Sequence, residues 1–429
     1  MRDVKKVLVI CAASRSGSSL LFEILRKSPV FYSLSGEAVP FYKLRGLDAR
    51  YFGSDAVPSS FIPCDRQFSA ISDDFCGDFH SVSLEKEVFG SGAILERYID
   101  DLLLRFPLQW PGVAFSGPVF RRLTVKAFRL QKASAPCFNR EDFYLELLAL
   151  LKKVYPRINP YYYDIPTDKV RKKFPALRIP AGPPHGPFTI EEPPFILLSP
   201  RGNVAKKDLS DKILLLKSSV DCYRLPLLEK LFPCAEIKFI HLVRNPAASV
   251  NGLYDGWLYR GFFSYNLRFL LSGWTGRHKG LLSIRGYSGK RSWSRCWWKY
   301  DLPPGWREYT GRALEEVCVF QWYSANKAVI EYLKNRPGRS LRVNHEQIIC
   351  GSLSRRREIE FILKFCGVRP ENAGLERLRD IPTVQATFAP RPFRWKERAG
   401  LLLPLLKSPL ISRFSRSLGY DPGNRKEWL

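Results

Sequence analysis

Runs of apolar residues alternate along this chain with apolar positions at helical spacing. Three apolar-rich runs have the length of strands buried inside a sheet: Val7–Ile10, Ile213–Leu216 and Ile237–Val243. Leucines at helical spacing follow the second run over 225–232, and Pro246 begins a helix after the third run, with Asn245 as its cap. Strands that alternate with helices in this way indicate a parallel sheet.

Three further segments extend this pattern. Helices are predicted at Asp142–Val154 and Leu314–Leu333, and a short strand at Ser340–Val343. Between the first helix and Asp142 the pattern indicates mainly loops. We therefore predict an α/β fold, a P-loop-like three-layer α/β/α arrangement with a central, mainly parallel sheet and irregular insertions, as a single domain over 1–429.

Two segments interrupt the alternation. Residues 156–210 are rich in proline, which blocks helix interiors and central strands, so they are predicted to form an irregular insertion. Residues 273–309 hold five of the ten tryptophans among many lysines and arginines and are predicted to form a second insertion. Its aromatic rings either stack on an acceptor molecule or pack as a cluster beneath a surface loop.

Composition narrows the functional classes. The net charge of +27 comes from 68 basic and 41 acidic residues and favours anionic ligands without choosing among them. Ten cysteines without a Cys-x-x-Cys pair and five histidines show no metal-ligand spacing, so no metal is predicted and buried thiols are favoured over disulfides. No apolar run has the length of a membrane span, and no signal peptide is recognisable, so we expect a cytoplasmic protein.

The segment after the first strand is suited to binding phosphate. Cys11 to Ser19 is a loop of small residues that leads into a helix, and it contains Arg15, Ser16, Gly17, Ser18 and Ser19. A helix start presents unpaired N–H groups and the positive end of the dipole, and small residues allow an anion to approach closely. The loop lacks the lysine and first glycine of the Walker pattern, so an ordinary ATPase or kinase loop is not favoured.

Two further cations follow strands. Lys217 ends the second predicted strand, and Arg244 ends the third. Because ligands of parallel sheets bind outside the carboxyl ends of the strands, Lys217 and Arg244 are expected to converge with Arg15. Three cations at three strand ends suit a ligand with separate anionic groups.

These residues carry a resemblance to a known family. Ser14–Leu20 resembles the 5′-phosphosulfate loop of sulfotransferases that use 3′-phosphoadenosine 5′-phosphosulfate, most of all the carbohydrate-type and bacterial members, which have Arg where the aryl enzymes have Lys. Phe239–Pro246 resembles the family's 3′-phosphate motif. Three later segments resemble the family's late helix, late strand and C-terminal nucleotide-binding stretch: Gln321 to Asn326, Leu341–Glu346 and Arg391 to Lys396.

The resemblance implies the donor site. It assigns the 5′-phosphosulfate to Arg15 and Ser16–Ser19, the 3′-phosphate to Arg244, and further nucleotide contacts to Arg394 and Lys396. The family's 3′-phosphate motif usually has a serine at the position of Gly252, so Ser249 or a backbone N–H must replace that contact here. The donor 3′-phosphoadenosine 5′-phosphosulfate is thus the predicted co-substrate.

Sulfuryl transfer is an in-line displacement that places negative charge on the departing oxygen. Arg15, with Lys217 second, is predicted to stabilise that charge, and Asp221 is the candidate base, with a helix cap as its alternative role. The acceptor is a hydroxyl or an amine, a glycan or a small metabolite among the candidates, and nucleic acid is not the expected partner. Two other classes remain as alternatives: a P-loop-like kinase or other nucleotide-dependent transferase, and a basic nucleic-acid-binding protein.

Overall fold

The computed structural model describes residues 1–79, 92–110, 112–160, 165–178, 182–183, 204–270, 282–378, 384, 387–426 and 428. Its centre is a five-stranded sheet of β1 (Lys6–Cys11), β2 (Phe31–Ser33), β3 (Ile213–Lys217), β4 (Glu236–Val243) and β7 (Ser340–Asn344). The strand order is β2-β3-β1-β4-β7, and every pair is parallel. All five strands therefore end at the same edge, where the predicted site residues lie.

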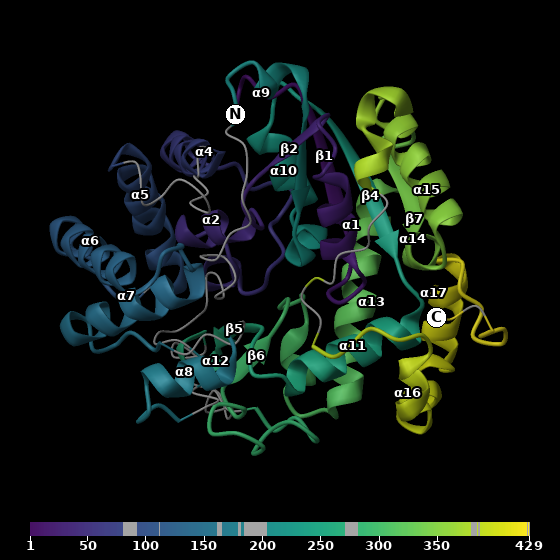
Figure 1. Cartoon of the computed structure of the whole chain (residues 1–429). Coiled ribbons are helices and arrows are strands. Elements are labelled where there is room, and N and C mark those ends of the chain that lie inside the picture. Colours follow the sequence, from purple (N-terminus) through teal and green to yellow (C-terminus); the bar gives the residue numbers. More distant parts are fainter. Residues whose placement is uncertain are drawn as a thin grey trace.

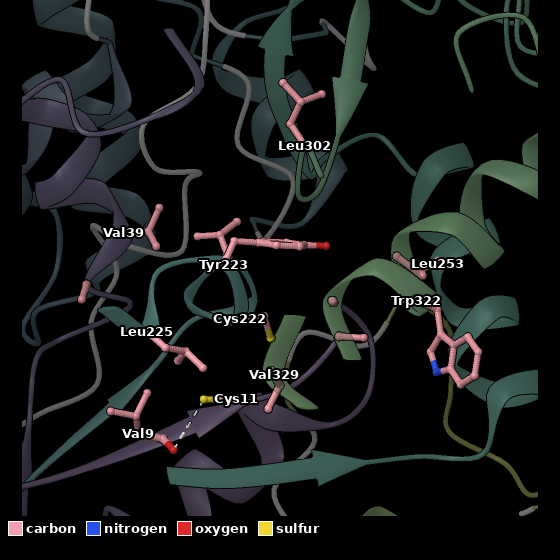
Figure 2. Packing of buried hydrophobic residues seen from close by; sticks show 14 of the residues in the cluster. Val9, Cys11, Val39, Cys222, Tyr223, Leu225, Leu253, Leu302, Trp322 and Val329 are labelled. Atoms are coloured by element: carbon pink, nitrogen blue, oxygen red, sulfur yellow. Dashed lines mark hydrogen bonds between the residues drawn. The ribbon is translucent and has the colours of Figure 1, made fainter. Parts of the chain in front are cut away.

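Both faces of the sheet are buried. Along β1, Val7, Val9 and Cys11 belong to one apolar core, and Leu8 and Ile10 belong to another. Figure 2 shows Val9 and Cys11 in the first of these cores together with Leu225 from α10 and Val329 from α13. Because successive side chains of a strand point to opposite faces, a strand covered on both sides is apolar throughout.

Helices cover the two faces. The first core contains residues of α10 (Leu225–Leu231), α11 (Pro246–Leu258) and α13 (Leu314–Leu333). The second core contains residues of α1 (Ser18–Leu25), α14 (His345–Ile349) and α15 (Ser352–Phe365). The predicted fold class is confirmed: three layers, α/β/α, with a parallel sheet and a P-loop-like strand–loop–helix at β1 and α1.

The caps agree with the local sequence. The Asn245 side chain accepts a hydrogen bond from the Ala248 N–H at 2.8 Å, as predicted for the start of α11. The helix at Leu314–Leu333 has the predicted bounds, and the helix predicted at Asp142–Val154 is α7 (Arg140–Val154).

The segment predicted to be mainly loops is instead helical. Its described residues form five helices: α2 (Val39–Leu44), α3 (Ala49–Phe52), α4 (Asp65–Phe79), α5 (Gly92–Gln109) and α6 (Gly117–Ser134). The apolar stripes of these helices are broken by buried polar residues such as Asp78, Arg105 and Thr124, which weakened the sequence signal. Figure 1 shows α5, α6 and α7 together on the side of the molecule away from α16 (Ala399–Leu406) and α17 (Pro409–Ser417).

The helices α5, α6 and α7 share a third apolar core that reaches into the proline-rich segment. Ile158, Ile165 and Val170 are buried in it. The prediction of a wholly irregular segment is wrong for α8 (Thr167–Lys173), which fits between two prolines and pairs through Lys169 with Glu141 of α7. The segment also contains α9 (Asp208–Asp211), whereas 161–164, 179–181 and 184–203 lie outside the described residues.

The second predicted insertion contributes to the main core. Within it, β6 (Trp297–Lys299) pairs antiparallel with β5 (Phe263–Asn266), and the short helix α12 (Leu267–Leu270) follows β5. Trp297, Trp298 and Trp306 are all buried, so these rings pack as a cluster and do not stack on an acceptor. Trp274 lies outside the described residues.

Short 3-10 helices complete the fold: Ser219–Tyr223, Trp306–Tyr309, Pro370–Ala373, Leu375–Leu378 and Arg394–Arg398. All ten cysteines are free thiols, five of them buried. Among the helices of the described residues, none combines the length and the apolar composition that crossing a membrane requires.

Candidate functional site

The loop between β1 and α1 is the centre of the candidate site. Its backbone is unusual, because Arg15 has φ 68° and Gly17 has φ 91°. A left-handed conformation is uncommon for arginine and is typical of functional loops. A Cβ on Gly17 would lie 2.3 Å from Nδ1 of His345, so only glycine fits between the loop and the start of α14.

Arg244 joins the end of β4 to this loop. Its Nη1 donates a hydrogen bond to the backbone oxygen of Arg15 at 3.2 Å. A second contact joins the two segments, because the buried hydroxyls of Ser16 and Ser249 lie 3.3 Å apart. Ser249 therefore occupies the first turn of α11 beside the loop. Gly252, one turn further on, packs against Arg15, and a Cβ there would lie 3.1 Å from the Cβ of Arg15.

Positive charges crowd around Arg244. Burial lowers the pKa of Arg244, and the nearby charges of Arg15 and Arg394 act in the same direction, while Glu346 opposes them. The enclosed Nε of Arg244 has no hydrogen-bond partner within the described part of the chain. A buried donor among like charges is suited to an anion, which would supply both the acceptor and the missing negative charge.

The acidic neighbours of Arg244 are held by other groups. Glu346 Oε1 accepts hydrogen bonds from the backbone N–H and the side-chain amide of Asn245, at 2.9 and 2.8 Å. Its Oε2 accepts a hydrogen bond from the hydroxyl of Tyr420 at 2.6 Å. These contacts fix the turn that carries Arg244. Both carboxylate oxygens of Glu346 accept hydrogen bonds in these contacts.

The C-terminal segment reaches the same region. Arg394 and Arg398 both pair with the buried Asp255 of α11, and Arg398 also donates to the side-chain oxygen of Asn251 at 2.5 Å. Partial burial and the charges of Arg398 and Arg15 lower the pKa of Arg394. Of the two cations predicted here, Arg394 thus lies near Arg15, whereas the ammonium of the exposed Lys396 lies over the ring of Phe393. Sequence reasoning missed Arg398.

Arg15 points its side chain toward this C-terminal segment. Its Nη2 donates to the hydroxyl of Thr387 at 3.3 Å, and its guanidinium lies 5.2 Å from the centre of the Phe262 ring. The loop residue before it, Ser14, donates to the buried carboxylate of Asp301 at 3.0 Å. The loop is therefore tied to the β5–β6 region as well as to β4.

Lys217, at the end of β3, contacts the first turn of α1, directly after the loop. Its ammonium donates to the hydroxyl of Ser19 at 2.8 Å and forms an ion pair with Glu37. Glu37 follows β2, the neighbour of β3, and 30% of its side chain is exposed. Arg15 and Arg244 thus meet at the β1–α1 loop, and Lys217 contacts the first turn of α1 directly after it, where Glu37 joins Lys217.

Sequence reasoning missed Glu37. The preceding strand is only three residues long, so no periodicity marked it, and only the parallel pairing of β2 with β3 places its end beside Lys217. One sequence signal could have identified Glu37: a carboxylate that closely follows a short apolar run. If that run is a strand of the parallel sheet, the residues after it lie at the carboxyl edge, where ligands bind.

Asp221 is completely buried, near enough to Lys217 for the two charges to interact. Burial raises its pKa to about 7; Glu37 acts in the same direction, and Arg224 and Lys217 oppose it. Neither carboxylate oxygen has a hydrogen-bond partner among the described residues, and the residue that precedes α10 is Arg224. Asp221 is therefore not a helix cap, and its burial argues against direct contact with an acceptor.

No family model matches the chain, and no curated protein matches it. Solved structures with a similar arrangement include the sulfotransferase domain from the Synechococcus PCC 7002 olefin synthase, with 15% identity over 98% of this chain and 97% of that chain and a TM-score of 0.37.

Two others are the sulfotransferase domain from the curacin biosynthetic pathway and the sulfotransferase STF9 from Mycobacterium avium. The first has 11% identity over 97% of this chain and 99% of that chain, with a TM-score of 0.39. The second has 11% identity over 94% of this chain and 75% of that chain, with a TM-score of 0.32. At these low scores the likeness assigns neither a family nor an activity to this chain.

Proposed function

We propose that this chain is a sulfotransferase that takes a sulfuryl group from 3′-phosphoadenosine 5′-phosphosulfate and transfers it to a hydroxyl or amine. The proposal is carried by one observation. The two segments with anion-binding sequences meet, Arg244 to Arg15 and Ser249 to Ser16, amid an excess of positive charge. A ligand with two separate anionic groups suits this arrangement better than a single phosphate does.

In this proposal different parts of the site bind different parts of the donor. Arg244, with Ser249, binds the 3′-phosphate and fixes the orientation of the nucleotide. The start of α1, Ser16 to Ser19, binds the 5′-phosphate and sulfonate oxygens with its N–H groups and hydroxyls. Arg394 contributes further positive charge from the C-terminal segment, and Lys396 stands outside the proposed contacts.

The transfer breaks the bond between sulfur and the phosphate oxygen and forms a bond from the acceptor to sulfur. Arg15 and Lys217 stabilise the negative charge that develops on the departing oxygen. The acceptor proton goes to a carboxylate, and Glu37 takes the role of base in place of Asp221. Glu37 is partly exposed and pairs with Lys217, so the base and the cation lie together at the loop.

Nucleotide binding tests this proposal. Adenosine 3′,5′-bisphosphate should stabilise the protein against thermal unfolding by about 2.7 kcal/mol at a hundredfold excess over its Kd, whereas ATP with magnesium should not. Incubation with donor labelled in the sulfuryl group and a panel of glycans and small metabolites should then label an acceptor. Stabilisation by ATP with magnesium alone would favour a kinase. Salt-sensitive binding of single-stranded RNA without a nucleotide effect would favour a nucleic-acid-binding protein.

A further inference from the structure

A buried ion cluster lies between α4, α5 and the segment that follows β2. Arg105 of α5 is completely buried, and its Nε donates to Asp101 Oδ1 at 2.8 Å. Its Nη2 donates to Asp78 Oδ1 of α4 at 2.6 Å and to the hydroxyl of Ser35 at 2.9 Å. The other oxygen of Asp78 accepts the backbone N–H of Ser35 at 2.5 Å. Ser35 is therefore held through both its backbone and its side chain.

This cluster is charged despite its burial. Burial alone would lower the pKa of Arg105, but the carboxylates of Asp101 and Asp78 outweigh it and raise the pKa. Buried ion pairs of this kind add little stability compared with apolar residues of similar volume, because each charge loses its hydration. These ion pairs instead fix the local geometry, because a planar guanidinium holds its acceptors in defined positions.

The position of Ser35 in the chain links this buried cluster to the candidate site. Ser35 lies two residues before Glu37, which pairs with Lys217 at the candidate site. The strand that leads into this segment, β2, has three residues and pairs with β3 at the edge of the sheet that the described residues form. So short an edge strand constrains the following residues weakly, whereas two hydrogen bonds to Asp78 and Arg105 constrain them strongly.

We propose that Arg105, with Asp78 and Asp101, is the positioning device for Glu37. Helices α4 and α5 thereby set the geometry of the proposed base through Ser35. Arg105 is a positioning residue and not a catalytic one. Its effect on turnover rests on the proposed function, but its effect on the segment around Ser35 does not.

Hydrogen exchange of the backbone tests the positioning directly. In Arg105→Met, the amides of residues 34–38 should exchange at least about tenfold faster than in the unchanged protein, because charge-assisted hydrogen bonds to this segment are lost. Arg45→Met is the matched control. It removes a two-point ion pair to Asp74 of the same helix, α4, and leaves the Ser35 contacts in place.

Turnover provides the second measurement. Arg105→Met should lower kcat by about 100-fold, the effect of displacing a reacting group by roughly 1 Å, while the KM for the donor stays unchanged. Arg105→Lys keeps the charge and should recover part of the loss. Ser35→Ala removes the hydroxyl and keeps the N–H, so it should give a smaller loss in the same direction.

The outcomes separate the two proposals. Unchanged exchange at residues 34–38 in Arg105→Met and Ser35→Ala would overturn the positioning role, whatever the activity. If Arg105→Met does not fold, the exchange of Ser35→Ala and Arg105→Lys decides in its place. A protein that transfers no sulfuryl group to any acceptor refutes the proposed function, and the exchange data then still decide whether Arg105 holds this segment.

Discussion

The two ends of the candidate site differ in how their charges are balanced. At one end, burial lowers the pKa of Arg244, and the charges of Arg15 and Arg394 lower it further. Arg244 also has an enclosed donor without a partner among the described residues. At the other end, Lys217 is paired with Glu37, and the buried Asp221 lies near enough for its charge to interact with both. An excess of positive charge suits binding of an anion, whereas a paired cation and carboxylate suit the transfer of a proton.

The difference has a structural origin. The Arg244 end is built from β1, β4 and the C-terminal segment, all of which bring cations to one place. The Lys217 end is built from β3 and the edge strand β2, and the segment after β2 is the one that brings a carboxylate. We infer that the Arg244 end holds the 3′-phosphate of the donor and that the Lys217 end activates the acceptor, and substitutions at each end should therefore affect different steps.

The largest effect is expected at the Lys217 end. Glu37→Gln keeps the size of the side chain but removes its ability to accept a proton. We expect turnover to fall by up to about 10,000-fold, the range of general base catalysis, with little change in the affinity for adenosine 3′,5′-bisphosphate. Steady-state kinetics and calorimetric titration measure the two quantities.

A matched carboxylate gives the control for Glu37. Glu229 of α10 is 28% exposed and pairs with Arg336 and Arg339, away from the loop. Glu229→Gln should leave turnover unchanged. Near-normal turnover of Glu37→Gln would show that Glu37 does not take the acceptor proton. The proposed difference in role between the two ends would then be wrong.

Asp221 gives the next largest effect, on stability as a function of pH. Its pKa is raised by burial from 3.8 to about 7, so between these values the unfolded chain has released a proton that the folded protein still holds. The contribution of Asp221 to the free energy of unfolding is fully present below about pH 4 and is lost as pH rises toward 7. The total loss is on the order of 4 kcal/mol. Asp221→Asn should therefore gain stability relative to the unchanged protein across this range.

The measurement is urea unfolding of both proteins at several pH values from 4 to 8. His241 and His345, whose pKa values are lowered by burial, act in the opposite direction in the unchanged protein. Because both proteins share these histidines, their contribution cancels in the difference. A difference that does not vary with pH would show that Asp221 titrates in the folded protein as it does in the unfolded chain.

The smallest of the three effects is expected at the Arg244 end. Arg244→Ala removes the donor to Arg15 and one charge of the crowded group. We expect adenosine 3′,5′-bisphosphate to bind roughly 100-fold more weakly, the loss of charge-assisted hydrogen bonds, with a weaker dependence of binding on salt. Arg342→Ala is the control, because Arg342 is exposed and also donates to a backbone oxygen, that of Ser417, at 2.9 Å. Unchanged nucleotide affinity in Arg244→Ala would contradict the division of the site.

Much of the sheet could be predicted because its signals are local. A buried strand is apolar over its own length, and the alternation with helices implies that the strands are parallel. Because parallel strands end at one edge, the order of the elements along the chain is enough to place Lys217 and Arg244 beside the β1–α1 loop. The helices α4 to α6 escaped prediction because buried polar residues, Arg105 among them, interrupt their apolar stripes.

The sequence by itself thus determined the parallel sheet, the small-residue loop and the cations that follow the strands, since each depends on neighbours in the chain. Only the tertiary structure decided which carboxylate is available. It buried Asp221 completely and brought Glu37 to Lys217 across the pairing of β2 with β3. It also directed Trp297 and Trp298 into the core. The exposure of a side chain and its contact partners depend on residues from distant parts of the chain that pack against it. A local sequence pattern contains no information about those residues.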